Sequence, residues 1–583
     1  MRALVDAYAS IDPRALGLFR LAFGAVLLGD LLARWADVSL FYSNEGLLSS
    51  HFNAFHPPSR PMFSLLTAFA SPGEVKAAFA GFGLVYFLHM VGAFTGVTRV
   101  LVPVLCASLT ARNALVVNAG ASVMTLVALW TAFMPLGARF SVDAVRASLR
   151  DRPERDFSEL SALERPRSAW VSVAALGVLL ELVAIYGLNS LQKSGDTWRS
   201  GEAFHDVLWQ DRLVTGAAAW LRAREAPWLS PLVSTGVRVM EAGVALLLLL
   251  PFRREWTRPL AVAGIFVFHG ASLALFSLGA LPWVMMATAL LMLPASALDW
   301  LGARVRRLST PVAFTVDPRT PGQGWTLRTL SRLDTFGLLT LSAGDQPLDD
   351  RALARAAAAL PFGRCVAPVL GWLAPALSRV AERVAAASES PRVPAPRSPL
   401  GEQIAGTVAS ARESLAGVFL VAALMQISQE NRAVPAALRF GVPPQLAPLA
   451  GYAGIHRRWS LFAPDAPRRD GALVIDARTE DGRRIDPLSG RAPLDDPRGA
   501  GPAGLGQLRC DYALNLSLDS NAAYREELRR WLRAWRGPEG RAEDRLVSFV
   551  VSWVTWETPR PGRPAPGPVD RRVLLTFPTP APK

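Results

Sequence analysis

Several uninterrupted runs of about twenty apolar residues constrain this 583-residue chain more than any other feature. In lipid, only α-helices and closed β-barrels satisfy their backbone hydrogen bonds within the spanning structure. The alternation with period two that a barrel requires is absent from these runs. The chain is also 51% apolar, which is too high for an ordinary soluble protein of this length. The sequence therefore predicts an all-α polytopic membrane bundle.

We expect residues 1–300 to form a transmembrane domain of eight spans. A further apolar run at 414–429 is short for a span, and it either crosses the membrane as a ninth span or does not cross. The eight predicted spans cover approximately residues 15–35, 75–96, 98–118, 121–139, 169–189, 228–252, 259–278 and 279–298.

The arginines predict the orientation of these spans. The net charge of +14 would suggest nucleic-acid binding in a soluble protein, but many arginines lie between predicted spans, so nucleic acid is excluded as a partner. Seven lie between residues 139 and 167, which marks that loop as cytoplasmic. We predict a multi-pass protein of the cell inner membrane with a cytoplasmic N-terminus and a basic cytoplasmic insert at 301–413. Nine spans place the tail at 430–583 outside; eight place it in the cytoplasm.

Lysine is almost absent from this chain. Only Lys76, Lys193 and Lys583 occur among its 62 lysine and arginine residues. Lys193 follows the fifth predicted span and begins a polar stretch that runs to Gly201. A lysine at the edge of hydrocarbon can lose its proton when it is desolvated and then serve as a base, which a guanidinium cannot do. Lys193 is therefore a candidate catalytic base; the alternative is a lysine that extends from a helix end to the membrane interface.

Charged residues within the predicted spans are expected to face the interior of the bundle, because lipid penalises them. Arg238 and Glu241 are three residues apart, and we expect them to form an intramembrane pair. Arg20 is expected to pair with an acid such as Asp30 or Glu181. These charges are interpreted as structural.

Two aromatic residues near the spans each have two possible roles. His269 is either a hydrogen-bonded histidine inside the bundle or a contact for a bound ligand. Trp198 belongs either to the aromatic belt at the membrane interface or to a surface on which a cofactor stacks. The three cysteines, Cys106, Cys365 and Cys510, lie in different segments, so the sequence predicts neither a disulfide framework nor a metal site.

The tail at 430–583 changes from long apolar runs to shorter patterns. Residues 472–478, 546–556 and 572–577 are strand-like, with proline and glycine between them. Residues 524–535 have helical spacing. We therefore expect a small, β-rich extramembrane C-terminal domain.

Several short motifs carry a resemblance to a known family. The spacing of Tyr186, Lys193, Trp198 and Gly201 is the most specific, and the supporting stretches are residues 18–24, 140–144, 268–270, 276–279 and 459–464. With these residues the chain resembles the HTTM (horizontally transferred transmembrane) family, whose best-known relatives are the vitamin K-dependent γ-glutamyl carboxylases. The resemblance covers most of residues 15–300 and, more weakly, the tail.

The resemblance implies a role for each of these site residues. In the carboxylases, the lysine at the Lys193 position is taken as the base that deprotonates vitamin K hydroquinone. The oxygenated quinone then removes the γ-proton of a glutamate, and CO2 adds to it. The implied cofactors are a reduced quinone, O2 and CO2, without a metal, and the implied cofactor-binding residues are His269, Trp198 and Tyr186. One departure is that the carboxylases carry a histidine just before the fourth span, where this chain has Gly120.

The insert shows a second, fainter resemblance. Residues 312–317 and 327–337 are similar to the DCC-type thiol-disulfide oxidoreductase domains that accompany some HTTM proteins. The Asp-x-x-Cys that defines those domains is missing after Asp317, and without a thiolate there is no exchange chemistry. The segment is therefore either a degenerate thioredoxin-type remnant or a plain basic linker.

Two functional hypotheses follow for the whole chain. The first is an enzyme that couples oxygenation of a quinol to carboxylation of a glutamate, with Lys193 as the base and a protein or peptide substrate at the outer face. The second is a non-catalytic membrane protein that binds a lipid or quinone and a partner protein. The retained lysine favours the first, and the missing histidine favours the second.

Overall fold

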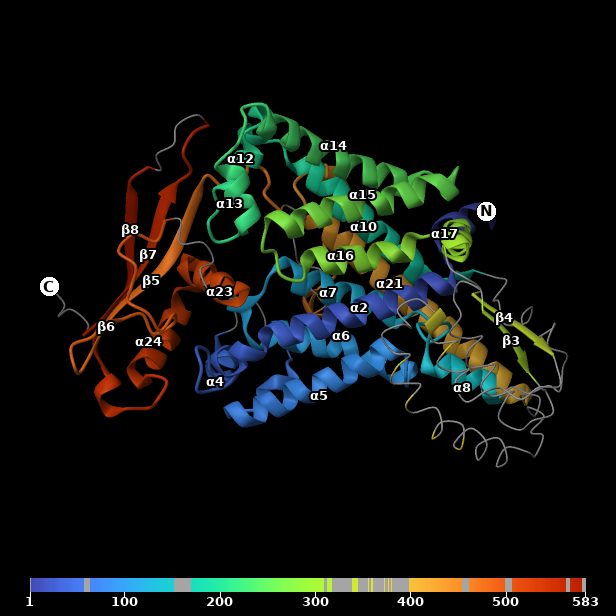
Figure 1. The fold of residues 1–583 in the computed structure, drawn as a ribbon, viewed down its shortest axis with the longest axis horizontal. Helices are drawn as coiled ribbons and strands as arrows, with labels where there is room; N and C mark the ends of the chain where they lie inside the picture. Colours follow the sequence, from blue (N-terminus) through green and yellow to red (C-terminus); the bar gives the residue numbers. More distant parts are fainter. Residues whose placement is uncertain are drawn as a thin grey trace.

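The structure is a computed structural model that describes residues 2–56, 63–150, 169–308, 312–316, 338–343, 398–452, 461–498, 506–561 and 567–578, with single positions between 355 and 379. Its described part is mostly helical, and its largest sheet lies in the C-terminal part of the chain (Figure 1). The helices of the bundle are α2 (Pro13–Arg34), α5 (Pro72–Val91), α6 (Thr95–Arg112), α7 (Ala119–Ala132), α10 (Val173–Gln192), α14 (Leu229–Leu249), α15 (Arg254–Leu275), α16 (Leu281–Ala289), α17 (Ala295–Leu308) and α21 (Pro399–Glu430).

Six helices of the described chain are long and apolar enough to cross a membrane, which supports a multi-pass membrane protein. They are α2 with its continuation to Tyr42, α5, α10, α14, α15 and α21. The predicted third and fourth spans correspond to α6 and α7, which have 18 and 14 residues and are not among these six. The total of nine spans stays a prediction.

The predicted eighth span is bent rather than straight. The 3-10 turn η4 (Leu290–Met292) extends α16, and α17 follows at an angle of 102° to it. Pro294 lies at the break, where its missing N–H and its ring prevent the helix from continuing. The bent pair counts as a seventh candidate span if it is taken as one.

The predicted short run at 414–429 is part of a much longer helix. α21 has 32 residues and begins at Pro399, where the Ser398 hydroxyl accepts a hydrogen bond from the Gly401 N–H. A serine N-cap followed by proline is a strong helix start. α21 packs against α10, and its Phe419 ring meets Trp130 edge-on at a centroid distance of 4.5 Å.

The C-terminal domain contains a four-stranded antiparallel sheet in the order β6-β5-β7-β8. Its strands are β5 (Arg469–Thr479), β6 (Arg484–Ile485), β7 (Leu546–Glu557) and β8 (Val569–Phe577), and its helices include α23 (Gln507–Ser517) and α24 (Arg525–Ala534). The three predicted strands and the predicted helix at 524–535 are confirmed. α23, which packs against the turn η3 (Ala114–Val116) of the bundle, was not predicted from the sequence.

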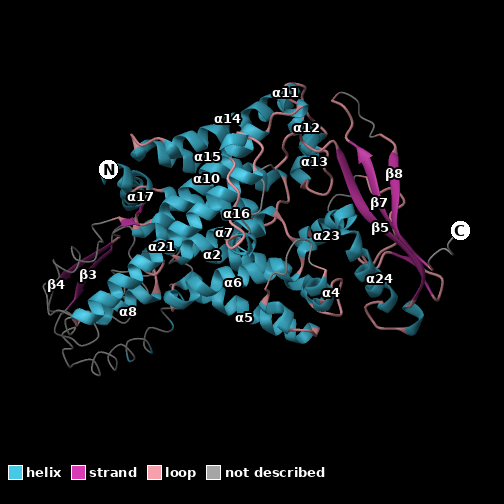
Figure 2. Cartoon of the chain, turned by 180° about the vertical axis from the view of Figure 1, so that it is seen from behind, coloured by secondary structure: helices cyan, strands magenta, loops and turns pink. Residues whose placement is uncertain are grey.

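The C-terminal domain and the loop that follows α10 lie at the same end of the bundle. The Gly195 N–H donates to the Pro464 carbonyl oxygen at 2.9 Å. The parallel pair β3 (Val312–Val316) and β4 (Leu339–Ala343), from the basic insert, lies at the opposite end (Figures 1 and 2). The tail and the Lys193 loop are therefore not separated by the bundle. Residues 327–337, which carry half of the second resemblance, lie outside the described residues.

Candidate functional site

A cavity of about 320 Å³ lies where the bundle meets the C-terminal domain. Its walls come from α7, α10, α14, α15 and α16, from the short helices α11 (Asp196–Ser200) and α12 (Ala203–Leu208), and from the tail. Its size falls in the range of small-molecule sites, and most of its lining is apolar. Its polar or aromatic lining includes Tyr186, Asn189, Lys193, Trp198, Glu241 and His269.

Lys193 caps the C-terminal end of α10 and turns its side chain into this cavity. Its ammonium forms an ion pair with Glu241 on α14, and the two side chains are only 3% and 2% exposed. The Trp198 ring lies 4.9 Å from Lys193 Nζ, at cation–π distance. The alternative reading of Lys193, a side chain that extends to the membrane interface, is wrong because the side chain is buried.

The environment of Lys193 favours loss of its proton. Burial lowers the pKa of the Lys193 ammonium, while the Glu241 carboxylate opposes this shift. Glu241 also accepts a hydrogen bond from Asn189 Nδ2 at 2.7 Å. A buried lysine and glutamate in contact can exist as an ion pair or, after proton transfer, as two neutral groups. Within the pair, the proton can therefore lie on either group without leaving a lone buried charge.

Tyr186 and His269 form the second polar pair in the wall of the cavity. The Tyr186 hydroxyl lies 2.9 Å from His269 Nε2, and both side chains are buried. Tyr186 is three residues before Asn189 on α10, so the two polar groups stand about one helical turn apart on neighbouring positions of the same face. His269 is thus hydrogen-bonded inside the bundle, as one of its two readings predicted.

Three buried polar atoms of the cavity residues have no hydrogen-bond partner within the described chain. They are Glu241 Oε2, Asn189 Oδ1 and His269 Nδ1. A buried polar atom without a partner costs free energy, so each is a position where a ligand group or a water fits. Because a hydroxyl group donates one hydrogen bond, a molecule with hydroxyl groups at two edges of an aromatic ring could satisfy one of the two oxygens and the His269 nitrogen.

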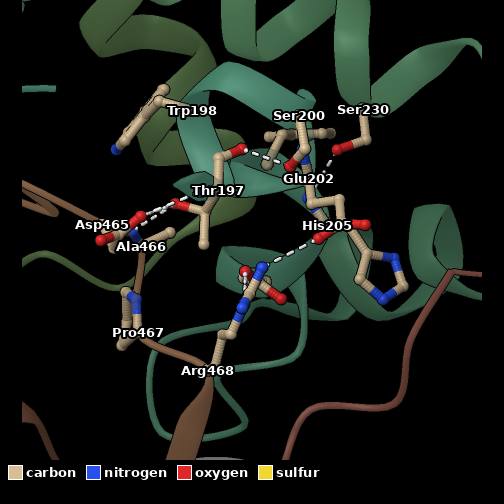
Figure 3. A network of polar contacts seen from close by, with 12 residues as sticks. Thr197, Trp198, Ser200, Glu202, His205, Ser230, Asp465, Ala466, Pro467 and Arg468 are labelled. Atoms are coloured by element: carbon tan, nitrogen blue, oxygen red, sulfur yellow. Dashed lines mark hydrogen bonds and ion pairs between the residues drawn. The ribbon is translucent and has the colours of Figure 1, made fainter. Parts of the chain in front are cut away.

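The tail closes one side of the cavity, which we call its roof. Leu461 and Phe462 line it, and Trp198 Nε1 donates to the Phe462 carbonyl oxygen at 2.7 Å. Thr197 bonds to Asp465 through its backbone N–H at 2.9 Å and its hydroxyl at 3.2 Å (Figure 3). Trp198 is therefore part of a contact between loop and tail as well as a cavity wall. Trp459 and Ser460, which begin the tail motif, lie outside the described residues.

His205 on α12 joins the loop to the tail from the other side of this contact. Its Nδ1 lies 2.6 Å from Glu225 Oε2, and its Nε2 lies 2.8 Å from the Pro559 carbonyl oxygen. Both neighbours are acceptors, so only the doubly protonated ring donates both bonds. Next to it, Arg468 of the tail pairs with Glu202 at 3.0 Å and with Asp206 at 3.6 Å (Figure 3).

Docking of the tail is therefore expected to weaken as pH rises. Burial lowers the pKa of His205, but the bonds to Glu225 and Pro559 outweigh burial and leave it raised. A raised pKa gives stabilisation that is complete below the unfolded value of 6.5 and is lost as pH rises through the folded value. Burial also raises the pKa of Asp206 to about 6, and Arg468 of the tail opposes this shift.

Hydrogen–deuterium exchange of residues 461–468 tests this expectation. The amide protection of this segment should fall between about pH 5.5 and about pH 8.5. In a His205→Gln variant most of that fall should disappear. Equal protection at both pH values in the wild type would contradict the role of His205.

Two of the predicted intramembrane charges have different partners from those expected. Glu241 pairs with Lys193 and not with Arg238, which is half-buried and has no ion pair among the described residues. Arg20 is fully buried, and it donates to the carbonyl oxygens of Met90, Leu136 and Phe140 rather than to an acid. The other predicted acid, Asp30, pairs with Arg34 at 2.6 Å.

Three parts of the site were not predicted from the sequence. Asn189 had a detectable signal, since it stands one helical turn before Lys193 in a mostly apolar helix. The other two parts are contacts between distant segments. Glu241 and Lys193 are 48 positions apart, and Trp198 and Phe462 are more than 250 positions apart, so no helical or strand spacing predicts either contact. No group of three or more metal-ligating side chains is found in the part of the chain that the structure describes.

Comparison with known proteins identifies the membrane bundle. The family model described as HTTM domain matches residues 8–300, about half of the chain. This range contains the bundle helices from α2 to α16, together with Lys193, Glu241, Tyr186 and His269. None of the curated proteins and none of the solved structures matches the chain. The chain belongs to the HTTM family.

Proposed function

We propose that this protein binds a reduced quinone in the cavity between α10, α14 and α15, and that the Lys193–Glu241 pair removes a proton from it. The observation that carries this proposal is a buried lysine amine, paired with a buried carboxylate, at the wall of a mostly apolar cavity of about 320 Å³. The link to γ-carboxylases, which is general to the HTTM family, points to the same chemistry.

The residues present fit a reduced quinone. The apolar lining suits its ring system, and the two polar pairs suit its two hydroxyl groups. At one edge of the ring a hydroxyl can donate to either Glu241 Oε2 or Asn189 Oδ1, and at the other edge His269 Nδ1 is free. The Trp198 ring, which lies over Lys193, keeps the amine out of water.

Each residue has a distinct role in this proposal. Lys193 is the base: as the neutral amine it accepts the proton of a quinol hydroxyl, and Glu241 stabilises the ammonium that results. Asn189 is a positioning residue, because its amide holds Glu241 at 2.7 Å. Tyr186 holds His269 so that Nδ1 faces the ligand. A bound quinol supplies the electrons for reaction with O2, which gives a quinone epoxide and water.

The position of Gly120 favours a second candidate, a protein that binds or oxygenates the quinol without carboxylating a glutamate. A Cβ atom at this position would lie 2.6 Å from the backbone nitrogen of Leu281 and 3.2 Å from the carbonyl carbon of Ala280. The backbone before α16 thus fills the space that a side chain would need. The carboxylases carry a histidine near this point, and this chain has no room for one.

A product assay distinguishes the candidates. The purified protein in detergent is given reduced menaquinone and O2, and a parallel reaction adds a glutamyl peptide and labelled bicarbonate. Epoxide without label in the peptide is the result expected. Label in the peptide would show a carboxylase and overturn the inference from Gly120. Bound quinone without epoxide would overturn catalysis and support a non-catalytic protein that binds a quinone.

The position of the tail suggests where a partner protein would bind. The loop after α10 and the C-terminal domain share one face of the bundle, so a protein or peptide partner would meet the cavity roof there. We propose that this face is on the outer side of the cell inner membrane and the basic insert is in the cytoplasm, because the arginine-rich loops other than the Lys193 loop follow the positive-inside rule. Reporter fusions at residue 1 and residue 583 should then report opposite sides of the membrane.

A further inference from the structure

A second and larger cavity lies on the other side of α16 from the first. It has a volume of about 910 Å³ and runs between α2, α15 and α16, with the first turn of α23 at one end. Met285 faces the Lys193 cavity, and Met286 faces this second one, so α16 is the partition between them. We call this second cavity the α2 groove.

The α2 groove opens toward the membrane rather than toward water. Ala25, Gly29 and Ala33 on α2 line it and are exposed, as are Phe266 and Trp283 on the facing helices. α2 and α15 are both candidate spans, so the medium beside this flank is lipid. From Ala22 to Ala33 the helix rises about 17 Å, close to the depth of one leaflet of about 15 Å.

One end of the groove carries charges of both signs in closed pairs. Arg34 pairs with Asp30 at 2.6 Å, and Asp37 pairs with Arg509 of the tail domain at 2.8 Å. No charge in these two pairs is left over to attract a ligand with a net charge. Trp283, which lines the groove, is exposed, and tryptophans are common at the level of lipid headgroups.

We propose that the α2 groove is a binding site for one zwitterionic phospholipid from the leaflet on the side of the C-terminal domain. An acyl chain lies along the small residues of α2, where the absence of long side chains lets it approach the helix backbone. The headgroup lies at the end with paired charges, where its ammonium meets Asp37 and its phosphate meets Arg34 or Arg509. The lipid thus contacts both the bundle and the tail domain.

The paired charges and the position of α16 between the two cavities distinguish a zwitterionic lipid from an anionic lipid and from the tail of a quinone. An anionic lipid would need an unpaired cation at the headgroup end, whereas Arg34 and Arg509 each hold a carboxylate. The isoprenoid tail of a quinone in the Lys193 cavity would have to pass α16, where Gly120 is in contact with Leu281. A zwitterionic lipid satisfies the paired charges and needs no passage through the wall.

Two matched glycine variants test the proposal. Gly29 on α2 and Gly81 on α5 are both exposed on candidate spans, and a Cβ at either meets nothing within 4 Å. Only Gly29 lines the groove. A leucine at Gly29 should fill the groove, and a leucine at Gly81 should not affect it.

Native mass spectrometry of delipidated protein, titrated with phosphatidylethanolamine or with anionic phosphatidylglycerol, gives the readout. The wild type and Gly81→Leu should each retain one phosphatidylethanolamine, and Gly29→Leu should bind it roughly tenfold or more weakly. Both variants should keep the melting temperature of the wild type, which shows that they fold.

Three outcomes would overturn the proposal. Equal retention by Gly29→Leu and Gly81→Leu would place the lipid elsewhere. Preference for phosphatidylglycerol would overturn the assignment of a zwitterionic headgroup. A dimer of the wild type that Gly29→Leu converts to a monomer would show that a second copy of the chain, and not a lipid, covers the groove.

Discussion

Replacing Lys193 with alanine is expected to lower the formation of quinone epoxide by roughly 10²- to 10⁴-fold, the usual contribution of a positioned general base. The substitution removes the amine that faces the cavity and leaves Glu241 without its cation. Arginine should not restore activity, because a guanidinium stays protonated under all conditions of the assay. The measurement is epoxide formed per minute from reduced menaquinone and O2.

Lys76 provides a matched control for this prediction. It is exposed near the start of α5 and lies away from the cavity, so Lys76→Ala should keep the activity of the wild type. Binding of oxidised quinone should survive in Lys193→Ala, since most of the cavity wall is unchanged. Full epoxide formation by Lys193→Ala would show that another group acts as the base.

Replacing Arg20 with methionine is expected to lower the free energy of unfolding by roughly 3 kcal/mol or more. The guanidinium is fully buried and bonds to the carbonyl oxygens of Met90, near the end of α5, and of Leu136 and Phe140, in the loop that follows α7. Without it, these buried acceptors lose their donor. Gly92 is part of the same arrangement, since a side chain there would overlap the guanidinium.

Arg238→Met is the control for Arg20→Met. Both arginines lie in candidate spans, but Arg238 is only half-buried and has no ion pair among the described residues. Its replacement should cost less than about 1 kcal/mol. Thermal melting of both variants in the same detergent compares them. A smaller loss for Arg20→Met than for Arg238→Met would contradict the structural role of Arg20.

The membrane class and the C-terminal sheet could be predicted because they rest on local patterns. Apolar runs long enough to span lipid are visible in any window of the sequence, and β5, β7 and β8 follow the alternation of a half-buried sheet. The bend before α17 also has a local signal in Pro294, which the predicted span at 279–298 did not take into account. α23 was missed because its packing against η3 is a contact between distant segments.

The candidate site was predictable only in part for the same reason. Lys193 was singled out because lysine is so rare in this chain, and its amine is buried at the wall of a cavity, while its role as a base stays a prediction. Glu241 was assigned to Arg238 because the two are three residues apart on one helix. Spacing along a helix describes only its own face, and the true partner of Glu241 comes from the end of a different helix.

Photo-crosslinking tests most directly whether a quinone occupies the cavity against Lys193. The purified protein is illuminated with an azido-quinone, digested and mapped by mass spectrometry, with and without excess menaquinone. The account predicts labels on cavity residues such as Tyr186, Trp198 or Phe268 that excess menaquinone removes. Labels confined to lipid-facing positions such as Leu84 and Phe87 on α5, unchanged by competition, would contradict it.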